Sequence, residues 1–239
     1  MSERTPTPID HLAEKYVAEA AKLDPDIAIY LGLEGDKTKF ADLSPAGREA
    51  EKELLARTRA DLSGLEPSDE VDWVTKADLT RELDLGLDMI EAKADQRDLN
   101  NLASPSQSIR MSFDMLPKES VEDWQVVAER LQGVSGALDG YIETLREGIA
   151  EGNTPARRQA QIVSETLGDY LEGEGYFGRL IAGADVPTEL AEELAAGAEK
   201  AKAAYGYFAE FLTMELLPAA AGEDAAFSGS EREDVLGSA

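Results

Sequence analysis

The chain has 239 residues, of which 49 are acidic and 23 are basic, with one histidine and no cysteine. The formal net charge of −26 repels phosphate backbones and anionic lipid, so no nucleic acid and no membrane surface is expected as a partner. The lack of cysteine excludes disulfides and cysteine-type zinc sites, and one histidine cannot supply both ligands of a His-Glu-x-x-His helix.

The N-terminal part of the chain carries a helical pattern. Thr7-Pro8 and Ser44-Pro45 are typical helix starts, and Asp24-Pro25 breaks the first helix. Apolar residues recur at helical spacing behind these starts. The pattern predicts long helices over residues 8–23, 45–62 and 69–94, with a short apolar segment at 27–31.

Residues 95–119 lose this pattern and are predicted to form one long irregular loop. Asn100-Asn101, Ser104-Pro105 and Leu116-Pro117 favour turns in this segment. Apolar side chains should nevertheless hold the loop against the rest of the protein, so we expect it to be ordered. These anchors are Ile109, Met111, Phe113 and Met115.

Helical spacing returns in the C-terminal half and predicts helices over residues 120–151, 154–171 and 187–218. Gly133 and Gly136 are expected to interrupt the first of these. The glycine-rich stretch at 173–183 follows no strand and precedes no Gly-Lys-Ser/Thr, so it fits a connection between helices better than a phosphate-binding loop.

The sequence thus predicts an all-α fold. We expect an antiparallel helical array or bundle of about seven helices with one long irregular loop. A helical domain is expected over residues 1–219, with a frayed tail, or the start of a further region, at 220–239. The N-terminus shows no signal-peptide pattern and no apolar run approaches the roughly 20 residues that span a bilayer, which favours a cytoplasmic protein.

Few residues carry an evident chemistry. His11 lies opposite the apolar face of its helix and is expected to point to solvent. The carboxylate pairs Glu143/Glu147 and Glu165/Asp169 each share a helix face and could hold a hard cation, but such an acidic chain produces solvated pairs by chance.

Three segments resemble the bacterial family called domain of unknown function 885. They are Asp26-Ile-Ala-Ile-Tyr-Leu-Gly-Leu, Phe40-Ala-Asp-Leu-Ser-Pro, and Leu145-Arg-Glu-Gly-Ile-Ala-Glu-Gly-Asn-Thr-Pro-Ala-Arg followed by Gln161-Ile-Val. The resemblance covers roughly residues 8–220. It implies a longer, mostly helical protein similar to thermolysin-like zinc metallopeptidases, whose His-Glu-x-x-His helix lies in the C-terminal half.

This chain has no His-Glu-x-x-His motif, so no zinc ligand and no catalytic residue carries over to it. The resemblance implies zinc only for a C-terminal catalytic half that this chain lacks, and no cofactor for the chain itself. It also implies that the helical region lines one side of a substrate cleft. Candidate contacts are Arg110 in the loop at 100–118, together with Thr154, Arg157 and Arg158.

Arg157 and Arg158 lie beside the start of a helix, a place that suits an anion or a substrate carboxylate. The alternative interpretation is that they only balance the surrounding acidic field, and we consider it the stronger of the two.

The last helix is apolar on more than one side near its end. Tyr207, Phe211 and Met214 form a second stripe beside the main one. We predict that they form a docking surface for the C-terminal catalytic half or another subunit.

Three hypotheses about function remain open. The first is the non-catalytic helical region of a zinc-dependent peptidase. The second is a stand-alone acidic helical module that binds a protein partner, and the third and weakest is an independent carboxylate-based enzyme.

Overall fold

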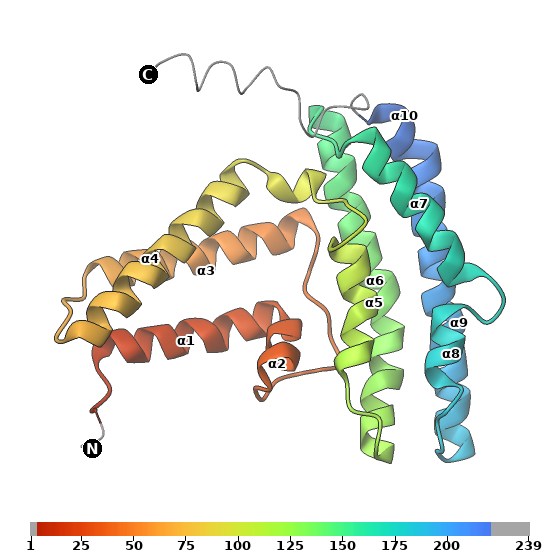
Figure 1. Ribbon diagram of the computed structural model, residues 1–239, viewed down its shortest axis with the longest axis horizontal. Helices are drawn as coiled ribbons and strands as arrows, with labels where there is room; N and C mark the ends of the chain where they lie inside the picture. Colours follow the sequence, from red (N-terminus) through yellow and green to blue (C-terminus); the bar gives the residue numbers. More distant parts are fainter. Residues whose placement is uncertain (1–3, 221–239) are drawn as a thin grey trace.

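The computed structural model describes residues 4–220, and within them helices joined by short connections account for the fold, with no strand (Figure 1). The predicted all-α class is confirmed. Within the same residues, no helix combines the length and apolar character needed to cross a membrane. The tail predicted at 220–239 lies, apart from Ala220, outside the described residues.

Three helices lie side by side and form an N-terminal layer: α1 (Pro8–Leu23), α3 (Pro45–Ser63) and α4 (Glu70–Glu91) (Figure 1). Each helix begins at a side chain that accepts a hydrogen bond from its first turn, namely Thr7, Ser44 and Asp69. The buried core of the layer consists of Ile9, Leu55, Leu62 and Leu83. The predicted bounds of these helices are close to the observed ones.

Two short helices join the layer to the rest of the molecule. Helix α2 (Pro25–Leu31) follows α1 around a corner, and Asp24 caps it by accepting a hydrogen bond from the Asp26 amide at 3.0 Å. The 3-10 helix η1 (Ala94–Arg97) follows α4 and packs on α6.

The C-terminal bundle is built around α6 (Val121–Glu151) and α9 (Thr188–Phe211), which pack against each other along much of their length and run in the same direction (Figure 1). Helices α7 (Arg157–Leu171) and α8 (Gly175–Ile181) bring the chain back between them. A π-helical turn, η2 (Leu212–Leu216), and α10 (Leu217–Ala219) follow α9.

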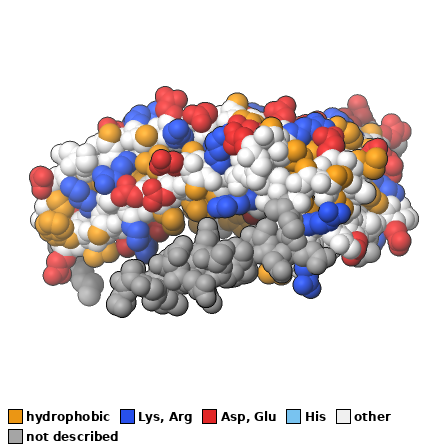
Figure 2. All heavy atoms as spheres, turned by 90° about the horizontal axis from the view of Figure 1, so that it is seen from above, with side chains coloured by type: hydrophobic (Ala, Val, Ile, Leu, Met, Phe, Trp, Pro, Cys, Tyr) orange, Lys and Arg blue, Asp and Glu red, His pale blue; other side chains and the backbone are white. Residues whose placement is uncertain are grey.

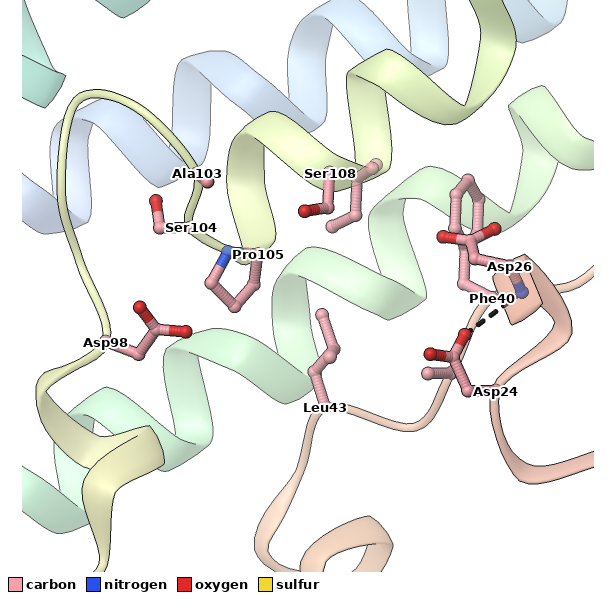
Figure 3. A pocket seen from close by; sticks show the side chains of 11 residues that line it. Asp24, Asp26, Phe40, Leu43, Asp98, Ala103, Ser104, Pro105 and Ser108 are labelled. Atoms are coloured by element: carbon pink, nitrogen blue, oxygen red, sulfur yellow. Dashed lines mark hydrogen bonds between the residues drawn. The ribbon is translucent and has the colours of Figure 1, made fainter. Parts of the chain in front are cut away.

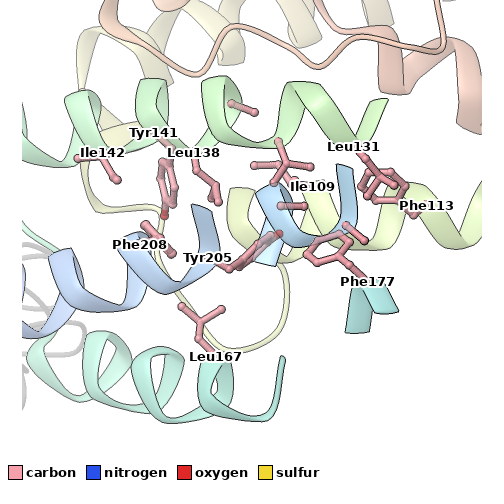
Figure 4. Close-up of a cluster of buried hydrophobic side chains, with 14 of the residues drawn as sticks. Ile109, Phe113, Leu131, Leu138, Tyr141, Ile142, Leu167, Phe177, Tyr205 and Phe208 are labelled. Carbon is pink, nitrogen blue, oxygen red and sulfur yellow. The ribbon is translucent and has the colours of Figure 1, made fainter. Parts of the chain in front are cut away.

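Aromatic rings from four helices meet in the core of this bundle (Figure 4). The ring centroids of Phe113 and Phe177 lie 5.7 Å apart, those of Phe177 and Tyr205 lie 5.5 Å apart, and those of Tyr141 and Phe208 lie 5.5 Å apart. These spacings are typical of favourable aromatic pairs, so the core joins α5, α6, α8 and α9 into one unit.

The prediction of one long irregular loop over residues 95–119 is wrong for the centre of that segment, where Pro105–Met115 form helix α5. Ser104 and Gln107 form a capping box, and Ile109 and Phe113, four residues apart, are both buried on its inner face. Met111 and Met115 lie on the outer face, so apolar residues of the inner and outer faces alternate along the sequence from Ile109 to Met115. The segment is held in place, but by Ile109 and Phe113 and not by all four predicted anchors.

Gly133 and Gly136 do not interrupt α6, which is continuous for 31 residues. Gly133 serves a close contact instead, because a Cβ atom there would lie 3.3 Å from the Phe40 ring. Similarly, a Cβ atom at Gly140 would lie 3.1 Å from the Ser44 nitrogen. The glycines therefore let the connection between α2 and α3 cross α6. The glycine-rich stretch at 173–183 also differs from the prediction, because it contains the helix α8.

Candidate functional site

A cavity of about 200 Å³ lies where the N-terminal layer meets the bundle (Figure 3). Its walls come from the start of α2, the connection between α2 and α3, the segment after η1, and the first turns of α5. Three carboxylates, a few small or hydroxylated residues and an apolar wall line it: Asp24, Asp26, Asp98, Ala41, Ala103, Ser104, Ser108, Phe40, Leu43, Pro105 and Ile109.

The local sequence explains how these side chains are placed. Asp24 and Asp26 are held at the start of α2 by the cap and by Pro25 in its first turn. Asp98 directly follows η1, and the buried hydroxyl of Tyr141 on α6 donates a 2.5 Å hydrogen bond to its backbone carbonyl. The cavity is therefore fixed by contacts from both regions of the molecule.

Arg130 on α6 lies behind the cavity, and its side chain is fully buried. Its Nε and Nη2 donate to the Ser112 hydroxyl at 3.1 and 2.9 Å, and Nη2 also donates to the Asp26 carboxylate. Its Nη1 donates to the carbonyls of Lys37 and Lys39. These five hydrogen bonds use all five donors of a guanidinium. The guanidinium also lies 3.9 Å from the centre of the Phe40 ring.

Because every donor of Arg130 is used, this residue joins α2, the α2–α3 connection, α5 and α6, and it has no donor left for a ligand. Its one positive charge offsets one of the three carboxylates around the cavity. The cavity therefore carries an excess of negative charge at neutral pH.

The pKa values of Asp24, Asp26 and Asp98 are raised above the ordinary value of an aspartate, and the largest cause in each case is the loss of water around the carboxylate. Arg130 opposes the effect on Asp24 and Asp26, and the charge of Asp95 adds to it on Asp98. A positively charged group in the cavity would stabilise the ionised carboxylates. The arrangement can thus attract a cation or an amine.

The donor set does not fit zinc. The single histidine, His11, has an exposed side chain, as predicted, and the chain has no cysteine. Between residues 4 and 220 no group of three or more histidine, aspartate or glutamate side chains could hold a metal ion. Of the carboxylates considered from the sequence, Glu147 pairs with Arg48 and Glu143 is exposed.

The predicted substrate contacts are not brought together. The Arg110 guanidinium lies over the rings of Tyr170 and Tyr176, at 5.7 and 4.8 Å, and pairs with Asp114 at 3.1 Å. Tyr170 is near the end of α7, whereas Arg157 and Arg158 are exposed at its start, about 20 Å away along the helix axis. Thr154 is partly buried before α7. The structure therefore does not bring these candidate contacts into one site, and their role in binding a substrate stays a prediction.

The predicted docking surface on α9 is wrong for one of its three residues. Phe211 is 2% exposed and belongs to the core of the bundle, where its ring is 6.3 Å from that of Phe208. Arg146 on α6 covers it from outside at 5.2 Å. Tyr207 and Met214 are exposed, at 48% and 69%, so any docking surface here is limited to these two.

Sequence reasoning missed the acidic cavity and Arg130. One signal for Arg130 exists, because it lies next to Leu131 and between Val127 and Val134 on the apolar stripe of its helix. A charged residue among core positions is expected to have a buried partner. The partner, Asp26, is more than a hundred residues away in the sequence. Across the face shown in Figure 2, by contrast, Asp and Glu side chains are interspersed with Lys and Arg.

These features define an acidic, all-helical protein with a carboxylate-lined cavity between two groups of helices. The chain belongs to the bacterial family described as "Bacterial protein of unknown function (DUF885)", whose model matches residues 25–233. Membership of this family, noted from the sequence as a resemblance, is thereby confirmed.

Among solved structures, the chain is similar to one described as "the putative lipoprotein from Colwellia psychrerythraea", with a TM-score of 0.72 and 16% sequence identity. The similarity covers 89% of this chain and 42% of that chain, so this chain spans less than half the length of its structural neighbour. No curated protein matches the chain.

Proposed function

We propose that this chain is the non-catalytic helical region of a zinc-dependent peptidase, in which it lines one side of the substrate cleft and docks on a C-terminal catalytic half. The observation that supports the proposal is the unequal share of the two chains in their structural similarity. The similar region makes up 89% of this chain but only 42% of the structural neighbour. The remaining part of such a longer architecture would supply the zinc ligands.

The cavity is the part of this chain best suited to face a substrate. It is concave, it combines apolar walls with a few polar groups, and it holds carboxylates with perturbed pKa values. In the proposed peptidase the cavity binds and orients the substrate, and the bond is broken elsewhere. Tyr207 and Met214 remain the proposed contacts with the catalytic half.

A second candidate function is a stand-alone acidic module that binds a protein partner. The outer face of α4 favours it, since it exposes four large apolar residues at helical spacing. They are Val71, Val74, Leu85 and Met89. A cytoplasmic location is part of both proposals.

The native gene product distinguishes the two functions. An antibody against residues 4–220 should recover, from cells that express the native gene, a polypeptide or stable complex of about twice this chain's mass. That material should contain zinc and cleave peptides, whereas the chain alone should do neither. A native protein of this chain's size, with no associated peptidase activity, would favour the binding module and reject the peptidase.

A further inference from the structure

We propose that the acidic cavity and the outer face of α5 together bind the amino-terminal end of a peptide whose first side chains are apolar. This inference rests on the proposed function and names the substrate class of the same cavity. It commits to one occupant, a peptide with a free amino group, on the basis of charge complementarity and of the apolar surface beside the cavity.

The charge around the cavity selects an ammonium group. Asp24, Asp26 and Asp98 line the cavity, and only Asp26 forms an ion pair, with Arg130, among the residues that the structure describes. The connection between α2 and α3 has two lysines: Lys39 pairs with Asp36 at 2.8 Å, and the charge of Lys37 acts on Asp123. A primary ammonium has three donors and can bind carboxylates directly.

The same surroundings disfavour an anion. A peptide carboxylate or a phosphate would lack a cationic partner in Arg130, because all five donors of its guanidinium are used within the protein. Placing a negative group beside the partly buried Asp24 and the exposed Asp98 would also add repulsion. The cavity therefore distinguishes the amino end of a peptide from its carboxyl end.

The apolar part of the proposed site is a methionine ridge on α5, formed by Met111 and Met115. Ser108 lines the cavity, and Met111 and Met115 follow it three and seven residues later on the outer face of the same helix. At 1.5 Å per residue they lie about 5 and 11 Å further along the axis. Successive residues of an extended peptide are about 3.3 Å apart, so the ridge can contact the first few side chains.

Both methionines are accessible to such a ligand, with exposed fractions of 43% and 53%. They place two large apolar side chains on one stripe beside the cavity, where a ligand held in the cavity can contact them. Methionine is flexible and adapts to side chains of different shape. The ridge should thus accept leucine, methionine or phenylalanine without strong preference, while the cavity requires the amino group.

The test uses the whole chain and two synthetic peptides, leucyl-leucyl-glycine amide and its N-acetylated form, in calorimetric titrations at pH 7. The free-amine peptide is expected to bind at least tenfold more tightly. Asp98→Asn and Asp24→Asn should each weaken its binding about fivefold or more. Asparagine keeps the acceptor that caps α2, so Asp24→Asn removes charge while the helix start is retained. The double variant Met111→Ala/Met115→Ala should weaken it severalfold.

Two variants on α4 serve as matched controls and should bind like the wild type. Asp88→Asn removes an exposed carboxylate away from the cavity, and Trp73→Ala removes a large apolar side chain that is 64% exposed. Thermal unfolding by circular dichroism checks that every variant is folded. Equal binding of the two peptides, or equal losses in the control variants, would overturn the proposal, because either result indicates general attraction to an acidic protein.

The outcome is separable from that of the proposed function. If the free-amine peptide fails to bind the folded chain, the peptide site is rejected, while the size and zinc content of the native gene product still decide the proposed function. If the peptide binds as expected but the native protein is this short and inactive, the site stands as that of a binding module.

Discussion

The N-terminal layer and the C-terminal bundle are stabilised in different ways. The bundle has a continuous core in which aromatic rings from four helices meet, whereas the buried core of the layer consists of four aliphatic residues. The layer relies more on polar contacts, such as those of Arg4 with Asp10, Asp69 and Asp72 at 2.5 to 2.6 Å.

This difference indicates which part is suited to bind and which part supports it. The bundle forms a rigid support, and the layer with α2 places carboxylates against it. The cavity lies where the two meet, and Arg130 is one of the residues that join them, together with Arg48 of α3, which pairs with Glu147 of α6. Substitutions in the layer, in the bundle and at the link between them should therefore have different effects.

A large effect, well above that of its control variant, is expected from Arg130→Met, which removes a buried link between the two regions. It leaves the Asp26 carboxylate and the carbonyls of Lys37 and Lys39 without their donor. Removing one partner of a buried ion pair typically costs about 3–5 kcal/mol. Urea unfolding should show a loss in this range. Arg81→Met, at an exposed arginine of α4, should change stability by less than about 0.5 kcal/mol, and an equal loss there would contradict the role of Arg130.

The second prediction compares the loss of unfolding free energy caused by one core substitution in the bundle with that caused by one in the layer. Phe208→Ala in the bundle should destabilise the protein by about 3–5 kcal/mol. Leu83→Ala in the layer should cost about 2–3 kcal/mol, because a small core between few helices relaxes more easily around a lost side chain. Urea unfolding of both variants under one set of conditions measures the two losses. A larger loss for Leu83→Ala would reverse the comparison.

The third prediction concerns the pH dependence of stability, which should have opposite signs at two carboxylates. Hydrogen bonds from Ser68 and Thr7, with the charge of Arg4, lower the pKa of Asp72 from 3.8 to about 2. Its ionised form therefore stabilises the fold above pH 4, and this contribution is lost as the pH falls from about 4 to about 2. Asp98 is the opposite case, because its raised pKa makes its ionised form costly in the folded state.

Thermal unfolding between pH 2 and pH 8 checks both carboxylates. Asp72→Asn should lower the melting temperature at pH 7 and flatten its fall at acid pH. Asp98→Asn should leave the melting temperature at pH 7 unchanged or raise it. A clear loss at pH 7 in both variants would show that the two sites do not differ in this way.

The smallest effect is expected at Met214, which is exposed beside the buried Phe211. Met214→Asp should change the free energy of unfolding by less than about 0.5 kcal/mol, because the side chain contributes little to the core. In size-exclusion chromatography the same change should weaken any association that uses this surface. A loss of several kcal/mol would mean that Met214 supports the fold, which would remove it from the proposed docking surface.

The sequence alone predicted most of the fold. The starts at Thr7-Pro8 and Ser44-Pro45 and the apolar spacing behind them were sufficient for α1 and α3, because a cap and an amphipathic stripe are both local features. Helix α5 was missed because it carries apolar residues on both faces, which hides the helical period. The break expected at Gly133 was wrong, because the helix continues through that glycine, which lies close to the Phe40 ring.

The candidate site was much harder to predict. Asp24, Asp98 and Arg130 belong to separate segments, and only the folded chain places them around one cavity. In a sequence with 49 acidic residues, nothing local distinguishes these carboxylates from solvated ones. The choice of Arg157 and Arg158 followed their helix start, a signal that does not show whether a concave surface lies nearby.

Hydrogen–deuterium exchange of the whole chain, with and without leucyl-leucyl-glycine amide, tests most directly whether the cavity between the two regions is the binding site. Slower exchange is expected in residues 24–43 and 98–116, which form the cavity and α5, with no change in α4 at 70–91. Protection confined to α4 or to the end of α9, or no protection at saturating peptide, would contradict the account.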